Sequence, residues 1–118
     1  MFTKDKHYFR VKYQKLKTVI KLSNGLRCDF KFAADNDNKL VFMLYPEFEC
    51  LSDESIVGDE WEALDQGTAL IHRPIFQDHA YHTLLKQRVC IGAKGYFVAG
   101  SERIAQVEII ELLNDPWP

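Results

Sequence analysis

An alternation of apolar and polar residues near the C-terminus, over residues 95–113, constrains the fold of this chain most strongly. A short aromatic and β-branched run, a polar Gly-Ser-Glu turn and a longer alternating run follow one another. In the longer run the apolar residues are Ala105, Val107 and Ile109. Period-two alternation on both sides of a turn is typical of a β-hairpin with one buried face.

Further strands are predicted in the first half of the chain. Residues 9–13 alternate, and a change of apolar parity then predicts a bulge or a bend near Gln14 and Lys15. An Asn-Gly turn at residues 23–25 precedes a clean alternation over residues 26–32. Residues 40–45 are apolar throughout and are interpreted as a central strand that stops at Pro46.

The second half gives weaker signals. Residues 68–76 read as a strand that Pro74 confines to an edge or a strand end. Residues 77–87 form either a short helix capped by Asp78 or a long loop. Residues 88–91 are predicted to form a short strand, residues 35–38 a loop and residues 114–118 a tail.

Many short strands and almost no helix predict an all-β fold, a small antiparallel β-barrel or sandwich, and we expect a barrel of about six strands. The 118 residues suit a single domain, residues 1–118, in which the C-terminal hairpin seals against the first strand. The chain has no apolar run near the roughly 20 residues of a membrane span. Its first residues lack the apolar core of a secretory signal, so we expect a cytoplasmic protein that does not bind membranes.

Three cysteines, Cys28, Cys50 and Cys90, are widely spaced and form no Cys-x-x-Cys pair. Their odd number argues against a disulfide framework and favours buried thiols in a reducing compartment. Cys28 and Cys90 take apparent core positions in strands, so we expect both to be unreactive.

Charge is distributed unevenly along the chain. Residues 1–32 hold nine Lys or Arg and two acids, whereas residues 33–118 hold six basic residues and fifteen acids. An acidic block without any basic residue comprises Glu47, Glu49, Asp53, Glu54, Asp59, Glu60, Glu62 and Asp65. Such asymmetry can mark partner surfaces; alternatively, the two regions lie side by side and offset each other.

The Leu-Ser-Asn-Gly-Leu-Arg segment at residues 22–27 and the residues from Gly95 to Ile110 are similar to segments of the C-terminal β-barrel domain of elongation factor Tu. The Leu-Ser-Asn-Gly-Leu-Arg segment at residues 22–27 resembles that domain's Leu…Gly-Gly-Arg segment. Gly95, Phe97 and the run from Arg103 to Ile110 resemble its final hairpin. The resemblance implies a six-stranded antiparallel barrel that docks protein and transfer RNA. GTP binding is not expected, because the chain contains no phosphate-binding Gly-x-x-x-x-Gly-Lys-Ser/Thr loop.

Candidate chemistry is confined to a few side chains. His72, His79 and His82, with Asp78 beside them, could hold a zinc ion in a small metal-dependent enzyme. The adjacent Arg73 disfavours a cation, and exposed or core-edge histidines are the simpler interpretation. No serine elbow or facing carboxylate pair is recognisable. We therefore expect no cofactor, no metal and no enzymatic activity.

Nucleic-acid binding is an alternative, because basic residues interleave with Tyr8, Phe9 and Tyr13 near the N-terminus. On a strand, however, Phe9 and Tyr13 point away from Arg10 and Lys12, which places the aromatic rings in the core. The net charge of −2 also argues against nucleic acid as the main partner.

The sequence is most consistent with a protein-binding module. Acidic residues around an aromatic anchor have the composition of a surface that attracts and grips a basic protein. Small acidic proteins of this size include the immunity proteins that neutralise bacterial nuclease toxins, and by that analogy the partner is a toxin with a basic cleft. The predicted binding residues are Glu47, Glu49, Asp53, Glu54, Asp59, Glu60, Trp61, Glu62 and Asp65.

Overall fold

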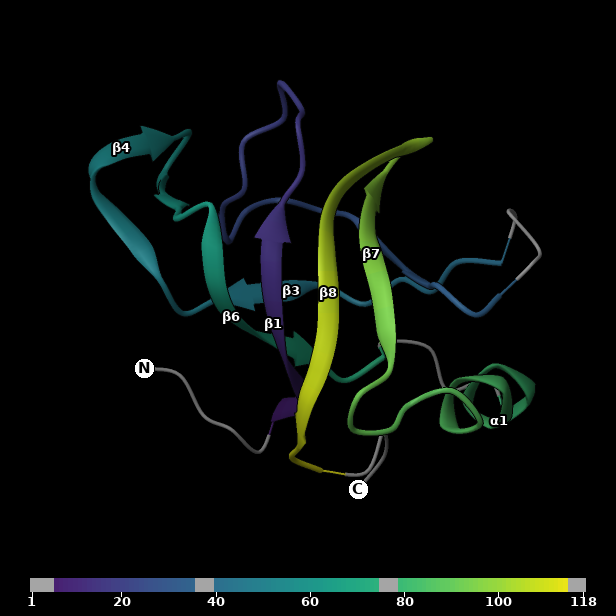
Figure 1. Cartoon of the computed structure of the whole chain (residues 1–118). Coiled ribbons are helices and arrows are strands. Elements are labelled where there is room, and N and C mark those ends of the chain that lie inside the picture. Colours follow the sequence, from purple (N-terminus) through teal and green to yellow (C-terminus); the bar gives the residue numbers. More distant parts are fainter. Residues whose placement is uncertain (1–5, 36–39, 75–78, 115–118) are drawn as a thin grey trace.

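A computed structural model describes residues 6–35, 40–74 and 79–114. In these residues the chain forms a six-stranded antiparallel sheet, a separate two-stranded hairpin and one helix, which confirms the predicted all-β class (Figure 1). The elements are β1 (His7–Lys15), β2 (Asp29–Phe32), β3 (Pro46–Phe48), β4 (Leu51–Val57), β5 (Glu60–Ala63), β6 (Gln66–His72), α1 (His79–Lys86), β7 (Lys94–Ala99) and β8 (Glu102–Leu112).

The six strands lie in the order β2-β7-β8-β1-β6-β3. The sheet curls so far that Phe30 of β2 reaches Phe42, which lies just ahead of β3 at the opposite end of the order. Two backbone hydrogen bonds join them, from Phe30 N to Phe42 O at 2.7 Å and from Phe42 N to Phe30 O at 2.9 Å. This single bridge does not close the sheet, so the architecture is a strongly curled sheet and not the closed barrel expected.

The predicted C-terminal hairpin is present as β7 and β8, joined by Gly100 and Ser101. Gly100 has φ +63° and no non-glycine residue of the described chain has positive φ, a combination typical of a type II′ turn with glycine first. Strand β8 continues along β1 from Phe9 to Lys15. The expected sealing of the first strand by this hairpin is confirmed.

Alternation in β1 separates two faces of the sheet. Phe9, Val11 and Tyr13 are buried in the core, while Lys12 is exposed and Arg10 is half-buried on the outer face. The core is rich in aromatic rings that meet edge to face, as Phe9 and Phe30 do at 5.7 Å between centroids. Such pairs add to the stabilisation that burial of apolar area provides. The predicted inward direction of the β1 aromatic residues is confirmed.

Hairpin β4–β5 leaves the sheet after β3 and stands at the other end of the molecule from α1 (Figure 1). Its base is held by three contacts. Ala63 N donates to Leu22 O at 2.7 Å, Leu64 N to Cys50 O at 2.9 Å, and the Tyr13 hydroxyl to Leu64 O at 2.6 Å. These contacts attach the base of the hairpin to the core. Farther along the hairpin, Ile56 and Trp61 are exposed to solvent.

Several expected strand boundaries are wrong. Of the bulge or bend expected near Gln14 and Lys15, no bulge is found there: β1 ends at Lys15, and its register shifts instead between His7 and Phe9 and between Arg10 and Val11. The strand expected over residues 40–45 is reduced to the bridge at Phe42. Strand β3 begins at Pro46 where a strand was expected to stop. Proline fits there because β3 is an edge strand and needs no N–H on its free side.

Around α1 the structure decides between the helix and the loop that the sequence left open, and two other expectations are wrong. Residues 79–86 are helical, with Leu85 buried against the core. Residues 88–91, however, form no strand, because the backbone N–H groups of Arg88 and Val89 both donate to Leu85 O, at 3.0 and 3.1 Å, in the turn that ends α1. The Arg88 guanidinium also binds the Asp35 carboxylate at 2.9 Å. Cys90 consequently lies exposed after the helix, and only Cys28 among the three thiols is buried.

Other expectations fall outside the described residues. These are the loop at residues 36–38, the cap Asp78 and the tail beyond Asn114. Within the described chain, α1 is the longest helix, and it is neither long nor apolar enough to cross a membrane.

Candidate functional site

The exposed end of hairpin β4–β5 carries an apolar pair. Ile56 and Trp61 face each other across the two strands, and 58 % and 44 % of their surfaces remain exposed. They share the face of β5 that bears Ala63, which is buried at the base of the hairpin. The pair therefore extends the apolar face of the hairpin beyond the core and into solvent.

Acidic residues surround this apolar pair. Between residues 51 and 65 the chain has six acids and no basic residue: Asp53, Glu54, Asp59, Glu60, Glu62 and Asp65. All of them are exposed except Glu62, which is half-buried and accepts a hydrogen bond from the Ser55 hydroxyl at 2.7 Å. We call the surface formed by these six acids, Ile56 and Trp61 the acidic hairpin.

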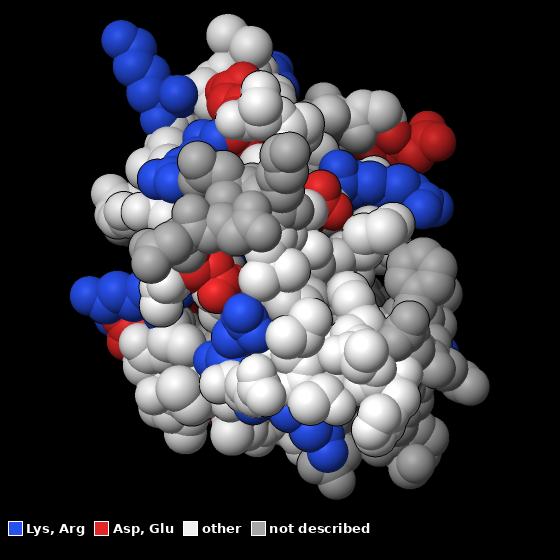
Figure 2. All heavy atoms as spheres, turned by 90° about the vertical axis from the view of Figure 1, so that its right-hand side faces the viewer, with Lys and Arg blue, Asp and Glu red and all other residues white. Residues whose placement is uncertain are grey.

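The side of the molecule that bears α1 has a different charge pattern. There lysine and arginine side chains are interspersed with acidic ones among many uncharged residues (Figure 2). The acidic hairpin lies at the opposite end of the molecule from α1 (Figure 1). It differs from the side that bears α1 because all of its charged side chains are negative.

Two residues of the predicted acidic block lie elsewhere, on the outer face of the main sheet. Glu49 accepts a hydrogen bond from Arg10 Nε at 2.8 Å, and Arg10 also binds Glu111. These two carboxylates raise the pKa of Arg10 further, the Glu49 hydrogen bond most strongly. At this point the positive charge of β1 and the negative charge of the acidic block neutralise each other. This agrees with the alternative interpretation of the uneven charge, in which the two regions lie side by side.

Glu47 of β3 lies between two histidines. Its carboxylate oxygens are 3.6 Å from His7 Nε2 and 3.6 Å from His72 Nε2. The two imidazole rings lie 4.6 Å apart between centroids. Within the described chain this is the only group of three or more potential metal ligands, with one ligand atom of each residue within 4.8 Å of the others. We call it the His-Glu-His cluster.

The electrostatics of the cluster favour an uncharged His72. Burial lowers the pKa of His72, and the neighbouring His7 and Lys6 lower it further, while Glu47 acts in the opposite direction. Neutral imidazole is the form that binds metal ions.

The histidines singled out from the sequence do not come together. Only His72 joins a potential metal site; His79 is exposed on α1, and His82 is buried beside Tyr81. The grouping of His72, His79 and His82 as a metal site is therefore wrong for the described residues. Sequence spacing missed His7 and Glu47 because strand pairing, not proximity along the chain, brings them to His72.

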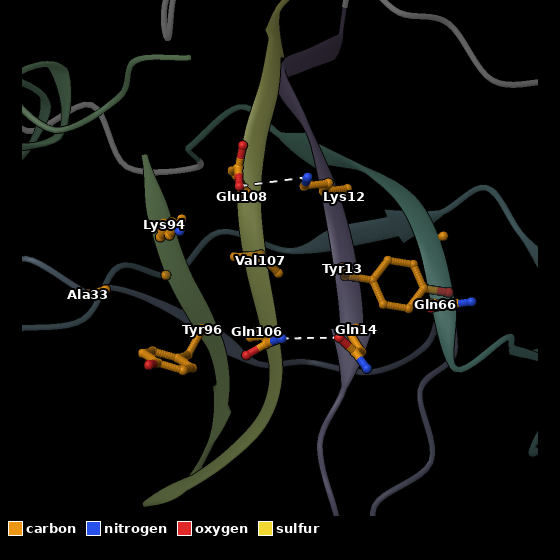
Figure 3. Close-up of a pocket in the computed structure, with 12 residues that line it drawn as sticks. Lys12, Tyr13, Gln14, Ala33, Gln66, Lys94, Tyr96, Gln106, Val107 and Glu108 are labelled. Carbon is orange, nitrogen blue, oxygen red and sulfur yellow. Dashed lines mark hydrogen bonds and ion pairs between the residues drawn. The ribbon is translucent and has the colours of Figure 1, made fainter. Parts of the chain in front are cut away.

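A shallow groove of about 660 Å³ runs over the outer face of β7, β8 and β1 (Figure 3). Polar and apolar surface contribute about equally to its lining, and four of the polar side chains are paired with one another. Lys12 Nζ lies 3.7 Å from Glu108 Oε1, and Gln106 Nε2 donates to Gln14 Oε1 at 3.1 Å. These four side chains are therefore less available to a ligand than the exposed side chains of the acidic hairpin.

Comparison with models of known protein families, with curated proteins and with solved structures finds no significant match. The resemblance to the C-terminal domain of elongation factor Tu therefore stays a prediction.

Proposed function

We propose that this protein is a non-enzymatic binding module that engages a basic protein through the acidic hairpin. One observation carries the proposal: the exposed pair Ile56 and Trp61 lies on a hairpin whose only charged side chains are acidic. Leaving such a pair in water has a free-energy cost that a partner would remove by covering it.

The acidic hairpin combines two properties of binding surfaces. Tryptophan is a frequent anchor in protein interfaces because it buries a large rigid area with little loss of conformational entropy. Acidic side chains around it accelerate association with a basic partner and disfavour acidic competitors. A protein that binds nucleic acid in a basic cleft has complementary charge, so an inhibitor of a nuclease toxin is the specific form of this proposal.

A nucleic acid is the less suitable partner for β1. The outward basic residues Arg10 and Lys12 are engaged by Glu49, Glu111 and Glu108. Binding phosphate would require those ion pairs to be broken, which reduces the net gain. The aromatic side chains that could stack on bases, such as Phe9, are buried in the core.

The test is a quantitative capture experiment with matched variants. Wild-type protein, Trp61→Ala, Glu60→Lys and Glu102→Lys are immobilised, and captured proteins are identified and quantified at low and moderate salt. Glu102 is an exposed acid of β8, so its reversal changes the net charge as Glu60→Lys does but outside the acidic hairpin.

We expect basic proteins to be retained by the wild type and by Glu102→Lys and to be lost with the other two variants. An anchoring tryptophan contributes about 2 kcal/mol or more, so Trp61→Ala should weaken binding roughly 30-fold. Capture that is equal for all four proteins and indifferent to salt would refute the proposal.

A further inference from the structure

We propose that the His-Glu-His cluster binds a divalent transition-metal ion, zinc in the first place, on the outer face of the main sheet. The inference is independent of the acidic hairpin and concerns His7, Glu47 and His72 alone. It rests on the way three paired strands bring these ligands together, on the spacing of their donor atoms and on their chemical types.

A β-bulge places His7 in the cluster. Phe9 pairs with Ile71 on the core side of the sheet, so regular alternation would also turn His7 toward the core. The register shift between His7 and Phe9 inserts Tyr8 as an extra residue and pairs His7 with His72 instead. The bulge thereby brings the two imidazole rings side by side, 4.6 Å apart between centroids and tilted by 44°.

The backbone around the ligands is well held. His72 N donates to Tyr45 O at 3.0 Å, and the Asn114 side-chain amide donates to His7 O at 2.8 Å. Glu47 is the central residue of β3, which pairs with β6. Ligands on three hydrogen-bonded strands lose little conformational freedom when an ion binds, and that preorganisation favours affinity.

The spacing of the donor atoms is close to the spacing of ligand atoms around a bound ion. Each carboxylate–imidazole distance is 3.6 Å, longer than a hydrogen bond. Ligand atoms about 2.1 Å from a tetrahedral zinc lie about 3.4 Å from one another. The two 3.6 Å distances end at different oxygens of Glu47, and with one ligand atom taken from each residue the three atoms lie within 4.8 Å of one another. Side-chain rotation that shortens the widest separation would therefore be needed to enclose an ion.

The ligand types indicate which ions fit. Two imidazoles and one carboxylate bind zinc and other late first-row divalent ions, whereas calcium and magnesium prefer oxygen ligands. The His7 side chain is 2 % exposed, while those of Glu47 and His72 are 28 % and 39 % exposed. The cluster thus opens to solvent on one side, which leaves a fourth position for water.

The proposal is tested by titrating the full chain with zinc chloride in a calorimeter and with cobalt chloride by visible absorption. We expect one equivalent of zinc to bind and cobalt to give the spectrum of a nitrogen- and oxygen-ligated ion. Glu47→Gln and His72→Gln, which keep the side-chain size close to the original, should each weaken zinc binding by about 100-fold or more. Zinc should raise the melting temperature of the wild type and not that of either variant.

Two matched controls distinguish this site from adventitious binding. His79→Ala removes an exposed histidine and Cys90→Ser an exposed thiol, and neither should change the zinc affinity. Zinc affinity that is unaffected by Glu47→Gln and His72→Gln, or the absence of stoichiometric zinc binding by the wild type, would overturn the inference.

A measurement on the unmodified chain is independent of how the variants fold. Zinc should shift the imidazole ¹⁵N resonances of His7 and His72 and leave those of His79 and His82 unchanged. Shifts confined to the other two histidines would also overturn the inference.

Discussion

Replacement of Gly95 by alanine should test how closely β2 and β7 are packed. Gly95 is buried and pairs with Phe32 across these strands. A Cβ atom at this position would lie 2.5 Å from the carbonyl oxygen of Lys31 and 2.8 Å from the Phe30 ring. The nearer obstacle is backbone, so rotation of a side chain cannot relieve it and the two strands must move apart.

The expected cost follows from this overlap. Forcing an extra methyl group into a packed site costs about 1–3 kcal/mol. For 118 residues, an unfolding entropy of about 2.1 cal/mol/K per residue makes 1 kcal/mol equivalent to about 4 °C in melting temperature. Gly95→Ala should therefore lower the melting temperature by about 4–12 °C.

Thermal and denaturant unfolding, followed by circular dichroism, measure the effect. Gly25→Ala is the control, because its Cβ would meet only the flexible Glu60 side chain at an ordinary 3.6 Å. We expect that variant to stay within about 0.5 kcal/mol of the wild type. If Gly95→Ala were as stable as Gly25→Ala, the close approach of β2 to β7 and the reasoning from it would be wrong.

Two further predictions concern the base of the acidic hairpin and the thiols. Tyr13→Phe removes the hydroxyl that donates to Leu64 O, so it should lower the free energy of unfolding by about 1 kcal/mol and accelerate amide hydrogen exchange in β4–β5. Unchanged amide exchange would contradict this role of Tyr13. Burial raises the pKa of Cys28 to about 12, so a thiol reagent at pH 8 should modify exposed Cys90 at once and Cys28 only after unfolding. Equal rates of modification for these two cysteines would show that Cys28 is not buried.

Much of the fold could be predicted because the strongest signals are local. The turn at Gly100 and the alternation beyond it give β7 and β8 directly. Strand β3 was missed as a strand because its three residues begin with a proline and are too few to show a pattern. Residues 88–91 were mistaken for a strand because four residues are too few to distinguish a strand from the turn after α1, in which Arg88 N and Val89 N bind Leu85 O.

The candidate sites differ in how far they could be predicted. The acidic hairpin is continuous in sequence, so composition alone identified Trp61 and its neighbouring acids. Composition could not show that Glu47 and Glu49 lie apart from the acids of the hairpin. Their position on the main sheet depends on the pairing of β3 with β6 and on the ion pair of Glu49 with Arg10. The His-Glu-His cluster was not predicted at all.

The sequence by itself determined the all-β class, the inward face of β1 and the closing hairpin, because each depends on the alternation of side chains along one strand. Only the tertiary structure decided which charges are paired and which ligands converge. His7 and His72 are far apart in the chain and meet through strand register and one bulge. A one-residue change of register reverses the face of a side chain, so such a site exists only once the strands have paired.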